Sequence, residues 1–264
     1  MAPRNPSQSF FTVTERAGEW VSPKQLQRFL QRYQLAGRYC SARNTVEVAC
    51  GTAPGAGYLE SVSKDFLAGD ISAELVDVAV AHYGDRVKIK RFDATEIPVA
   101  DESIDALIIY EAIYYLPSVE EFLTEARRVL RSGGILLIAT ANKDLMDFNP
   151  SDFSVAYYNP PELVELLSEV GFEATFFGGS PVSESGVFGL FYRQLKRWAS
   201  KAGLIPKTMK GKKLLKLLFS GGMVKMPVEM NGSFPEVEAP RRISADTIDL
   251  VHEVIYCAAE KIST

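Results

Sequence analysis

The sequence predicts an α/β fold in which helices cover both faces of a mostly parallel sheet. Short apolar runs alternate with helical patterns from residue 45 to residue 179, and such alternation is typical of βαβ units that share one sheet. The runs at 105–112 and 135–141 are almost continuously apolar. Strands of that kind are buried on both faces, as central strands of a parallel sheet are.

The first half of this pattern starts with a strand that enters a turn of small residues. The strand is TVEVA at 45–49, and Gly51, Gly55 and Gly57 follow it. Small residues between a strand and a helix let main-chain N–H groups approach a ligand closely. The next elements in order are a helix at 55–64, a strand at 66–70, a helix at 72–84 capped by Ser72, and a strand at 87–94.

The second half repeats the alternation. An amphipathic helix at 119–131 lies between the two buried strands and ends at a pair of glycines. The helix at 160–171 begins with prolines and ends with glycine, both in favoured places, and the strand FEATFFGG follows. The predicted organisation is a helical cap at 1–43, a core at 44–180, a basic helical lid or substrate insertion at 181–250 and a last core strand at 251–264.

The composition excludes several classes of protein. The 264 residues are 47% hydrophobic and carry a net charge of −4, which is ordinary for a globular protein and unlike a general binder of polyanions. The cysteines Cys40, Cys50 and Cys257 are too widely spaced for a disulfide framework or a zinc site. No signal peptide and no membrane-length apolar run are evident. We therefore expect a cytoplasmic protein without a bound metal.

Two acidic residues follow neighbouring strands of the predicted sheet. Asp70 ends the second strand, 19 residues after Gly51, and Asp93 follows the third. A carboxylate at the end of the second strand accepts hydrogen bonds from ribose hydroxyls in dinucleotide and other adenosine sites. The G-x-G-x-x-G pattern of dinucleotide enzymes is absent. The sequence thus favours an adenosine-containing ligand that lacks a pyrophosphate.

On these residues the sequence resembles the class I S-adenosylmethionine-dependent methyltransferases, in particular their small-molecule branch, type 11. The matching segments are VEVACGT, GDIS, FDATEIP, IDALIIYEAIYYLP and EARRVLRSGGILLIATAN, within a region from about Thr45 to Gly178. The resemblance implies a Rossmann-like, doubly wound sheet of seven strands, with HEVIYCAAEK as its antiparallel last strand and a helical insertion before it. It also implies an enzyme that transfers a methyl group from S-adenosylmethionine to an O or N atom of a small metabolite.

The resemblance assigns a cofactor site. Glu47 and the Ala49–Gly51 main chain would hold the methionine end, Asp70 the ribose, and Ile71 would pack on the adenine. The full set of implied cofactor residues is Tyr33, Glu47, Ala49, Cys50, Gly51, Asp70, Ile71, Asp93, Ala94 and Tyr110.

The glycine motif departs from the family pattern. The usual E/D-x-G-x-G-x-G is here Glu47-x-Ala49-x-Gly51-x-Ala53, which keeps only the central glycine. Each alanine adds a Cβ where main chain and ligand approach each other. The departure leaves open a second hypothesis, a methyltransferase-like binding protein that does not support turnover.

The candidate catalytic residues are Tyr115, Glu111 and His252. Tyr115 could orient a substrate hydroxyl or contact the sulfonium through its ring, and the alternative is a packing aromatic. Glu111 could act as a base, bind the cofactor or remain a solvated carboxylate. His252 lies beside the insertion and could reach a substrate. Tyr114, Tyr157 and Tyr158 are the candidate substrate-binding residues.

The insertion contains a strongly basic segment. Residues 191–226 carry ten Lys or Arg residues and no Asp or Glu, which leaves a charge of −14 on the rest of the chain. A solvated helical lid, an anionic small-molecule substrate and contact with anionic lipid all fit this composition. Nucleic acid is less favoured, since no recognised binding motif accompanies the charge. A tRNA or lipid methyltransferase is therefore the alternative to a small-molecule enzyme.

Overall fold

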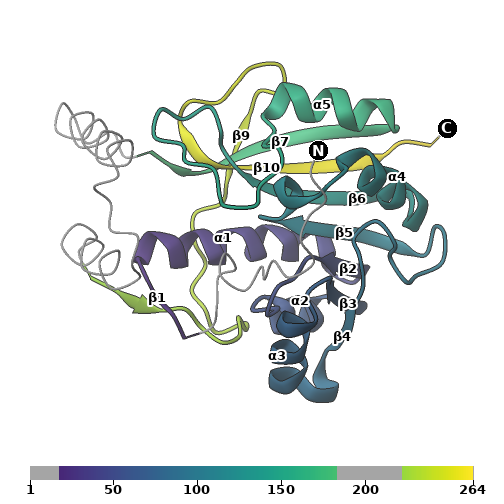
Figure 1. Ribbon diagram of the computed structural model, residues 1–264, viewed down its shortest axis with the longest axis vertical. Helices are drawn as coiled ribbons and strands as arrows, with labels where there is room; N and C mark the ends of the chain where they lie inside the picture. The colour runs from purple at the N-terminus through teal and green to yellow at the C-terminus, as the bar shows by residue number, and fades with distance from the viewer. Residues whose placement is uncertain (1–17, 183–221, 264) are drawn as a thin grey trace.

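An eight-stranded sheet organises the chain in the computed structural model, which describes residues 18–182 and 222–263 (Figure 1). The strand order is β4-β3-β2-β5-β6-β10-β7-β9. In this order, the strands β4, β3, β2, β5 and β6 pair in parallel with their neighbours. The strand β10 runs antiparallel between β6 and β7. In chain order these strands are β2 Asn44–Val48, β3 Asp65–Asp70, β4 Lys88–Arg91, β5 Ile104–Tyr110, β6 Leu130–Ala141, β7 Phe172–Pro181, β9 Arg241–Ile243 and β10 His252–Lys261.

The predicted α/β fold with an antiparallel last strand is confirmed, and the sheet has one strand more than expected. The additional strand is β9, which pairs antiparallel with the edge strand β7. It is three residues long and directly follows Pro240. A segment that short cannot show the alternation from which strands are predicted.

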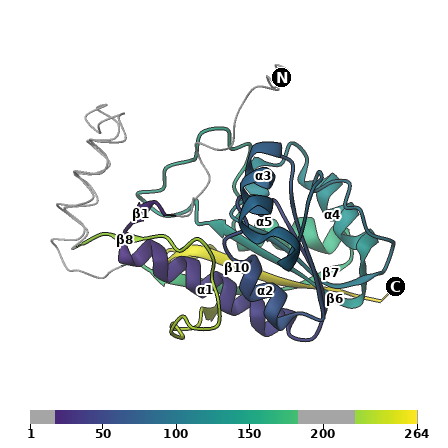
Figure 2. The same ribbon diagram turned by 90° about the horizontal axis from the view of Figure 1, so that it is seen from below.

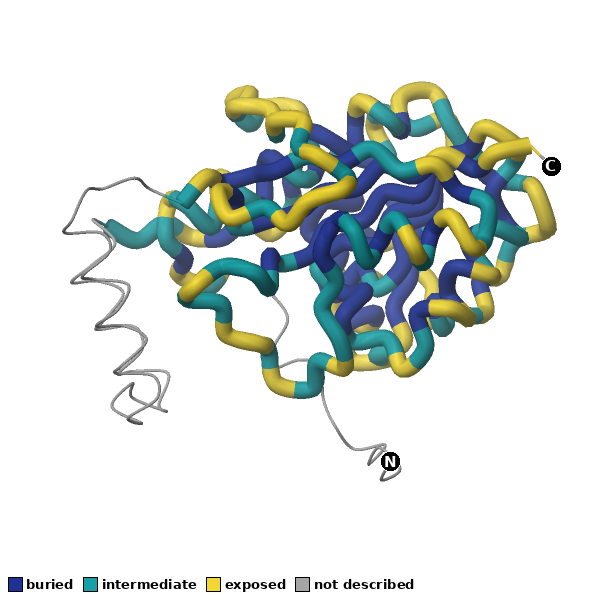
Figure 3. Tube along the Cα trace, turned by 90° about the horizontal axis from the view of Figure 1, so that it is seen from above, coloured by how far each residue is buried: buried dark blue, intermediate teal, exposed yellow. Residues whose placement is uncertain are grey.

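Helices cover both faces of the sheet, and side chains of the central strands alternate between two hydrophobic cores. Ile108 of β5 packs with side chains of α1, α2 and α3, while its neighbours Leu107 and Ile109 pack with side chains of α4 and α5. Figure 3 shows the buried strands enclosed by exposed loops and helix faces. The helices are α1 Pro23–Cys40, α2 Ala56–Val62, α3 Ala73–Tyr83, α4 Val119–Val129 and α5 Pro160–Glu169, with single 3₁₀ turns η2 Gly84–Arg86 and η3 Ile113–Tyr115.

Local sequence explains where these helices begin. The hydroxyl of Ser22 accepts a hydrogen bond from the Gln25 amide, and Pro23 occupies the first turn of α1. At α5, the side chains of Asn159 and Glu162 each accept a hydrogen bond from the other residue's amide. Such caps satisfy N–H groups that have no partner inside the helix.

The described part of the insertion, residues 222–250, contains no helix, and its stretch from β8 to residue 238 runs along α1 (Figure 2). The strand β8 Val224–Lys225 pairs with β1 Trp20–Val21. Farther on, Gln34 of α1 donates a hydrogen bond to the Pro235 carbonyl and accepts one from the Val237 amide. The helical character predicted for 181–250 therefore does not extend to this part. Its prolines at 227, 235 and 240 lack the N–H that a helix requires. Most of the basic segment, up to residue 221, lies outside the described residues.

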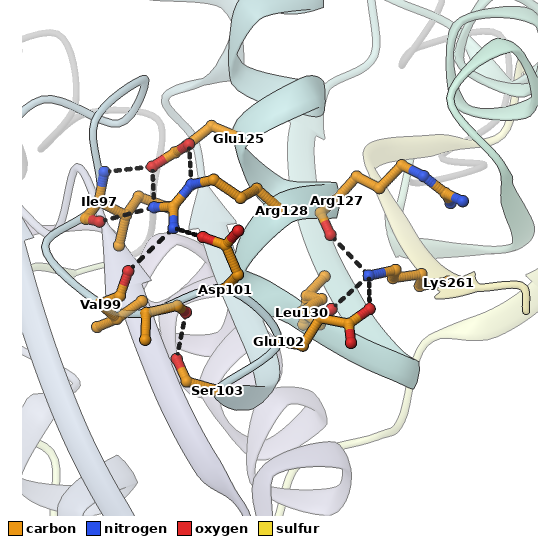
Figure 4. Close-up of polar contacts among 11 residues, drawn as sticks. Ile97, Val99, Asp101, Glu102, Ser103, Glu125, Arg127, Arg128, Leu130 and Lys261 are labelled. Carbon is orange, nitrogen blue, oxygen red and sulfur yellow. Dashed lines mark hydrogen bonds and ion pairs between the residues drawn. The ribbon is translucent and has the colours of Figure 1, made fainter.

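The buried Lys261 and the partly exposed Arg128 make hydrogen bonds at the end of the sheet where the parallel strands begin (Figure 4). The Lys261 ammonium, at the end of β10, donates to Glu102 Oε1 at 3.0 Å and to the carbonyls of Arg127 and Leu130 at 2.9 and 2.7 Å. The Arg128 guanidinium binds Glu125 and Asp101 beside it. Both cations join the last turn of α4 to neighbouring loops and strands. Within the described residues, no helix has the length and apolar composition needed to cross a bilayer.

We expect Lys261→Met to lower the free energy of unfolding by about 1–3 kcal/mol, because it leaves buried main-chain carbonyls without their donor. The matched control is Lys88→Met, which removes an exposed ion pair with Asp65 and should cost at most about 1 kcal/mol. Chemical denaturation measures both values. Equal losses in the two variants would contradict the role assigned to Lys261.

Candidate active site

A cavity of about 500 Å³ opens where β2, β3, β4 and β5 end. The strand order reverses between β2 and β5, and ligands of open α/β sheets bind at such a reversal. The residues that follow these strands line the cavity, among them Gly51, Asp70, Asp93 and Glu111. A second wall comes from one side of α1, through Gln25, Arg28, Arg32 and Tyr33.

The turn after β2 is left-handed at alternate positions. Ala49, Gly51 and Ala53 have φ values of 52°, 61° and 54°. A left-handed conformation costs a residue with a Cβ roughly 1–2 kcal/mol, which explains the preference of the related sequences for glycine. Main-chain hydrogen bonds nevertheless hold the turn, from the Cys50 amide to the Gly69 carbonyl at 3.0 Å and from the Ala53 amide to the Cys50 carbonyl at 2.9 Å. The two alanines therefore occupy strained left-handed positions in a turn that main-chain hydrogen bonds hold in place.

Asp70 connects this turn to the start of α3. Its Oδ2 accepts a hydrogen bond from the Gly51 amide, and its Oδ1 accepts one from the Ser72 amide, both at 2.8 Å. Burial raises the pKa of the carboxyl, and the hydrogen bonds from the amides oppose that shift. Each carboxylate oxygen has a second lone pair, so Asp70 can accept further hydrogen bonds from a ligand in the cavity.

Glu47 is a buried carboxyl group with one satisfied oxygen. Its Oε1 accepts a hydrogen bond from the Tyr33 hydroxyl at 2.8 Å, whereas its Oε2 has no hydrogen-bond partner among the described residues. Burial raises its pKa to about 7, against the lowering effects of the Tyr33 hydroxyl and of Arg32. A buried oxygen without a partner can accept a hydrogen bond from a donor group of a ligand.

Gly55 makes room for Tyr33. A Cβ on Gly55 would lie 2.0 Å from Cε1 of the Tyr33 ring. The bare glycine thus lets the ring pack against the turn while its hydroxyl reaches Glu47. This close approach is a second reason for small residues in the segment, in addition to the left-handed positions.

Three residues after β5 form the remaining polar part of the cavity. Glu111 has a φ of 53° and accepts a hydrogen bond at Oε2 from the Tyr114 hydroxyl at 3.0 Å. The Tyr115 hydroxyl lies 2.6 Å from Ser151 Oγ. Burial raises the pKa of both tyrosines, so their phenols stay neutral near pH 7 and serve as hydrogen-bonding groups.

Most of the predicted site residues meet in this cavity. All ten predicted cofactor residues line it, as do Glu111, Tyr114 and Tyr115. The ten are Tyr33, Glu47, Ala49, Cys50, Gly51, Asp70, Ile71, Asp93, Ala94 and Tyr110. No group of His, Cys, Asp and Glu side chains suited to a metal ion occurs in the described ranges.

The structure does not bring His252, Tyr157 or Tyr158 to the cavity wall. His252 is buried, with Nδ1 2.9 Å from Asp249 Oδ2, and its ring occupies the space above Gly178. Tyr157 lies behind the cavity, where its ring stacks on Tyr114 at 4.3 Å. Tyr158 is half-buried outside it. The catalytic role of His252 and the substrate-binding roles of both tyrosines stay predictions that the lining of this cavity does not support. None of residues 222–250 lines the cavity, and the lid stays a prediction as well.

The prediction from sequence missed the wall contributed by α1. Gln25, Arg28 and Arg32 follow the i, i+3, i+7 spacing that places residues on one helix face. That spacing, together with Tyr33, was visible in the sequence. Ser151, from the long loop after β6, had no comparable signal because loop residues have no periodicity.

Comparisons with known proteins agree with this fold. A family model described as a methyltransferase domain matches residues 46–138. A probable S-adenosylmethionine-dependent methyltransferase from Mycolicibacterium smegmatis is 32% identical over 147 residues, which cover 53% of this chain and 56% of that protein. Residues 46–138 thus match a methyltransferase domain, and the chain is similar to S-adenosylmethionine-dependent methyltransferases. It spans about half the length of the curated relatives it matches.

Solved structures share the fold at low sequence identity. A Thermotoga maritima S-adenosylmethionine-dependent methyltransferase, described as a possible histamine N-methyltransferase, has a TM-score of 0.56 and 17% identity, with 90% of this chain and 92% of that one covered. The [4+2]-cyclase SpnF also has a TM-score of 0.56, with 16% identity and coverage of 95% and 88%. Likeness at this level shows the fold alone, since one fold hosts different chemistries.

We expect Gly55→Ala to displace the Tyr33 ring and to lower the free energy of unfolding by about 1–3 kcal/mol, the usual cost of overpacking. Gly232→Ala is the matched control, because a Cβ there meets no atom within 4 Å. Thermal or chemical denaturation measures the difference. A Gly55→Ala variant as stable as the control would mean that Tyr33 does not pack against the turn.

Proposed function

We propose that this protein transfers a methyl group from S-adenosylmethionine to an O or N atom of a small metabolite. The observation that carries the proposal is the meeting of Glu47, Asp70 and Asp93, from three neighbouring strands, in one cavity. Their chemistry fits the parts of the cofactor in order. Glu47 Oε2 suits the ammonium group of the methionine, Asp70 suits the ribose hydroxyls, and Asp93 lies where the adenine edge would be held.

The cofactor would supply a methyl group activated by its sulfonium: an acceptor atom would attack the methyl carbon in line, and the sulfur would leave as the thioether of S-adenosylhomocysteine. The protein's part is to position the acceptor and to exclude water. Glu111 is the proposed group that orients the acceptor and takes its proton as the new bond to carbon forms. The Tyr114 hydroxyl holds the Glu111 carboxylate, and the Tyr115 hydroxyl with Ser151 offers a second polar contact for the acceptor.

A second candidate function is catalysis or binding without methyl transfer. The alanines at left-handed positions of the turn favour it. Both candidates require the cofactor site. They differ in whether S-adenosylhomocysteine accumulates when candidate acceptors are supplied, which mass spectrometry detects.

Replacing Asp70 tests the cofactor site. Asp70→Asn puts an amide NH₂ opposite a main-chain N–H and removes a charged acceptor. We therefore expect the binding free energy of S-adenosylmethionine to weaken by about 1.5–3 kcal/mol, which is roughly a ten- to a hundredfold loss of affinity. Asp65→Asn is the control, at the exposed start of the same strand. Calorimetry with S-adenosylmethionine and S-adenosylhomocysteine gives the affinities. The absence of binding of either molecule to the unaltered protein would refute the proposal.

The affinity should also depend on pH through Glu47. Because the pKa of this buried carboxyl is about 7, most of it is protonated at pH 5.5, and binding of an ammonium group requires it to release that proton. The affinity for S-adenosylmethionine should therefore rise roughly tenfold from pH 5.5 to 7. The α-amino group of the ligand, with a pKa of about 8, stays protonated over this range. Glu47→Gln should bind weakly at every pH in this range. A wild-type affinity independent of pH would contradict the role of Glu47.

A further inference from the structure

The α1 wall of the cavity carries two arginines, and the cofactor accounts for one of them. Arg28 and Arg32 are four residues apart, so their side chains leave the same face of the helix, about 5–6 Å apart at Cβ. Arg32 precedes Tyr33, whose hydroxyl binds Glu47. The methionine part of S-adenosylmethionine has one ammonium and one carboxylate. Glu47 suits the ammonium and the adjacent Arg32 suits the carboxylate.

Arg28 lies one helical turn farther along this wall, away from Glu47. It is held there by Glu253 of β10, whose Oε2 is 3.2 Å from the Arg28 guanidinium. The other oxygen of the same carboxylate binds the Lys24 ammonium at 2.7 Å. Two cations therefore share one anion at this end of α1, although Lys24 itself does not line the cavity.

The Arg28 guanidinium can take a further partner. About a third of its side chain is exposed, and a guanidinium has five N–H donors, of which a carboxylate occupies at most two. Arginine is also the side chain best matched to the planar, bidentate recognition of carboxylate and phosphate. The same cavity is lined by Tyr115, Leu116 and Pro117, which suit the less polar part of an acceptor.

We propose that the methyl acceptor carries an anionic group, a carboxylate or a phosphate, which Arg28 binds on the α1 wall with Lys24 and Glu253 positioning it. This inference rests on the proposed function, because it takes the other arginine to be used by the cofactor. The proposed anion-binding site consists of described residues and does not involve the basic segment at 191–226.

The test measures binding of small anions to protein saturated with S-adenosylhomocysteine. Benzoate and inorganic phosphate represent the two anionic groups, and benzamide is the neutral match for benzoate. We expect at least one anion to bind more tightly than benzamide and to lose at least fivefold in affinity in Arg28→Gln. Arg38→Gln is the control, since Arg38 lies on the same helix but pairs with Glu236 outside the cavity and should bind the anion as the unaltered protein does.

The outcomes separate this inference from the proposed function. If S-adenosylhomocysteine does not bind the unaltered protein, both fail. If it binds but neither anion does, or if Arg28→Gln binds the anions as well as Arg38→Gln, the inference alone is overturned. A loss of more than tenfold in S-adenosylhomocysteine affinity in a folded Arg28→Gln protein would also overturn it, because Arg28 would then serve the cofactor.

Discussion

The carboxylate of Asp70 is the group on which the geometry of the cavity depends. It joins the amide of Gly51, in the turn after β2, to the amide of Ser72, at the start of α3. These two connections follow neighbouring parallel strands, and they fix the edge of the sheet where the cofactor would lie. Tyr33 of α1 completes the arrangement by donating a hydrogen bond to Glu47 of β2. The site is thus a consequence of parallel strands whose carboxyl ends meet at one edge.

The altered glycine motif shows how such a turn tolerates substitution. Alanine at positions 49 and 53 keeps the left-handed conformation, and the main-chain hydrogen bonds and the Asp70 carboxylate supply the stabilisation that offsets it. The glycine that admits Tyr33, Gly55, is retained. An alanine can adopt a left-handed conformation at a cost in strain, whereas at position 55 its Cβ would occupy the space of the Tyr33 ring.

Much of the fold and of the lining of the cavity followed from the sequence because both depend on local signals. Buried strands were visible as apolar runs, and Asp70 was located by its distance from Gly51 in the chain. The placements that the sequence did not indicate depend on contacts in the tertiary structure. Whether His252 faces the cavity or Asp249 is decided by packing between strands distant in sequence, and Tyr157 is hidden behind Tyr114 by the path of a loop. The role proposed for Arg28 depends on its contact with Glu253 of β10, which lies far from it in the sequence.

Amide hydrogen exchange with and without S-adenosylhomocysteine tests the central claim most directly. If the edge of the sheet organised by Asp70 binds the cofactor, exchange should slow in residues 47–56, 70–72 and 93–95, which follow three neighbouring strands. Exchange in Arg241–Ile243, on the far edge of the sheet, should stay unchanged. Protection confined to other segments, or no change at a saturating concentration of ligand, would contradict the account.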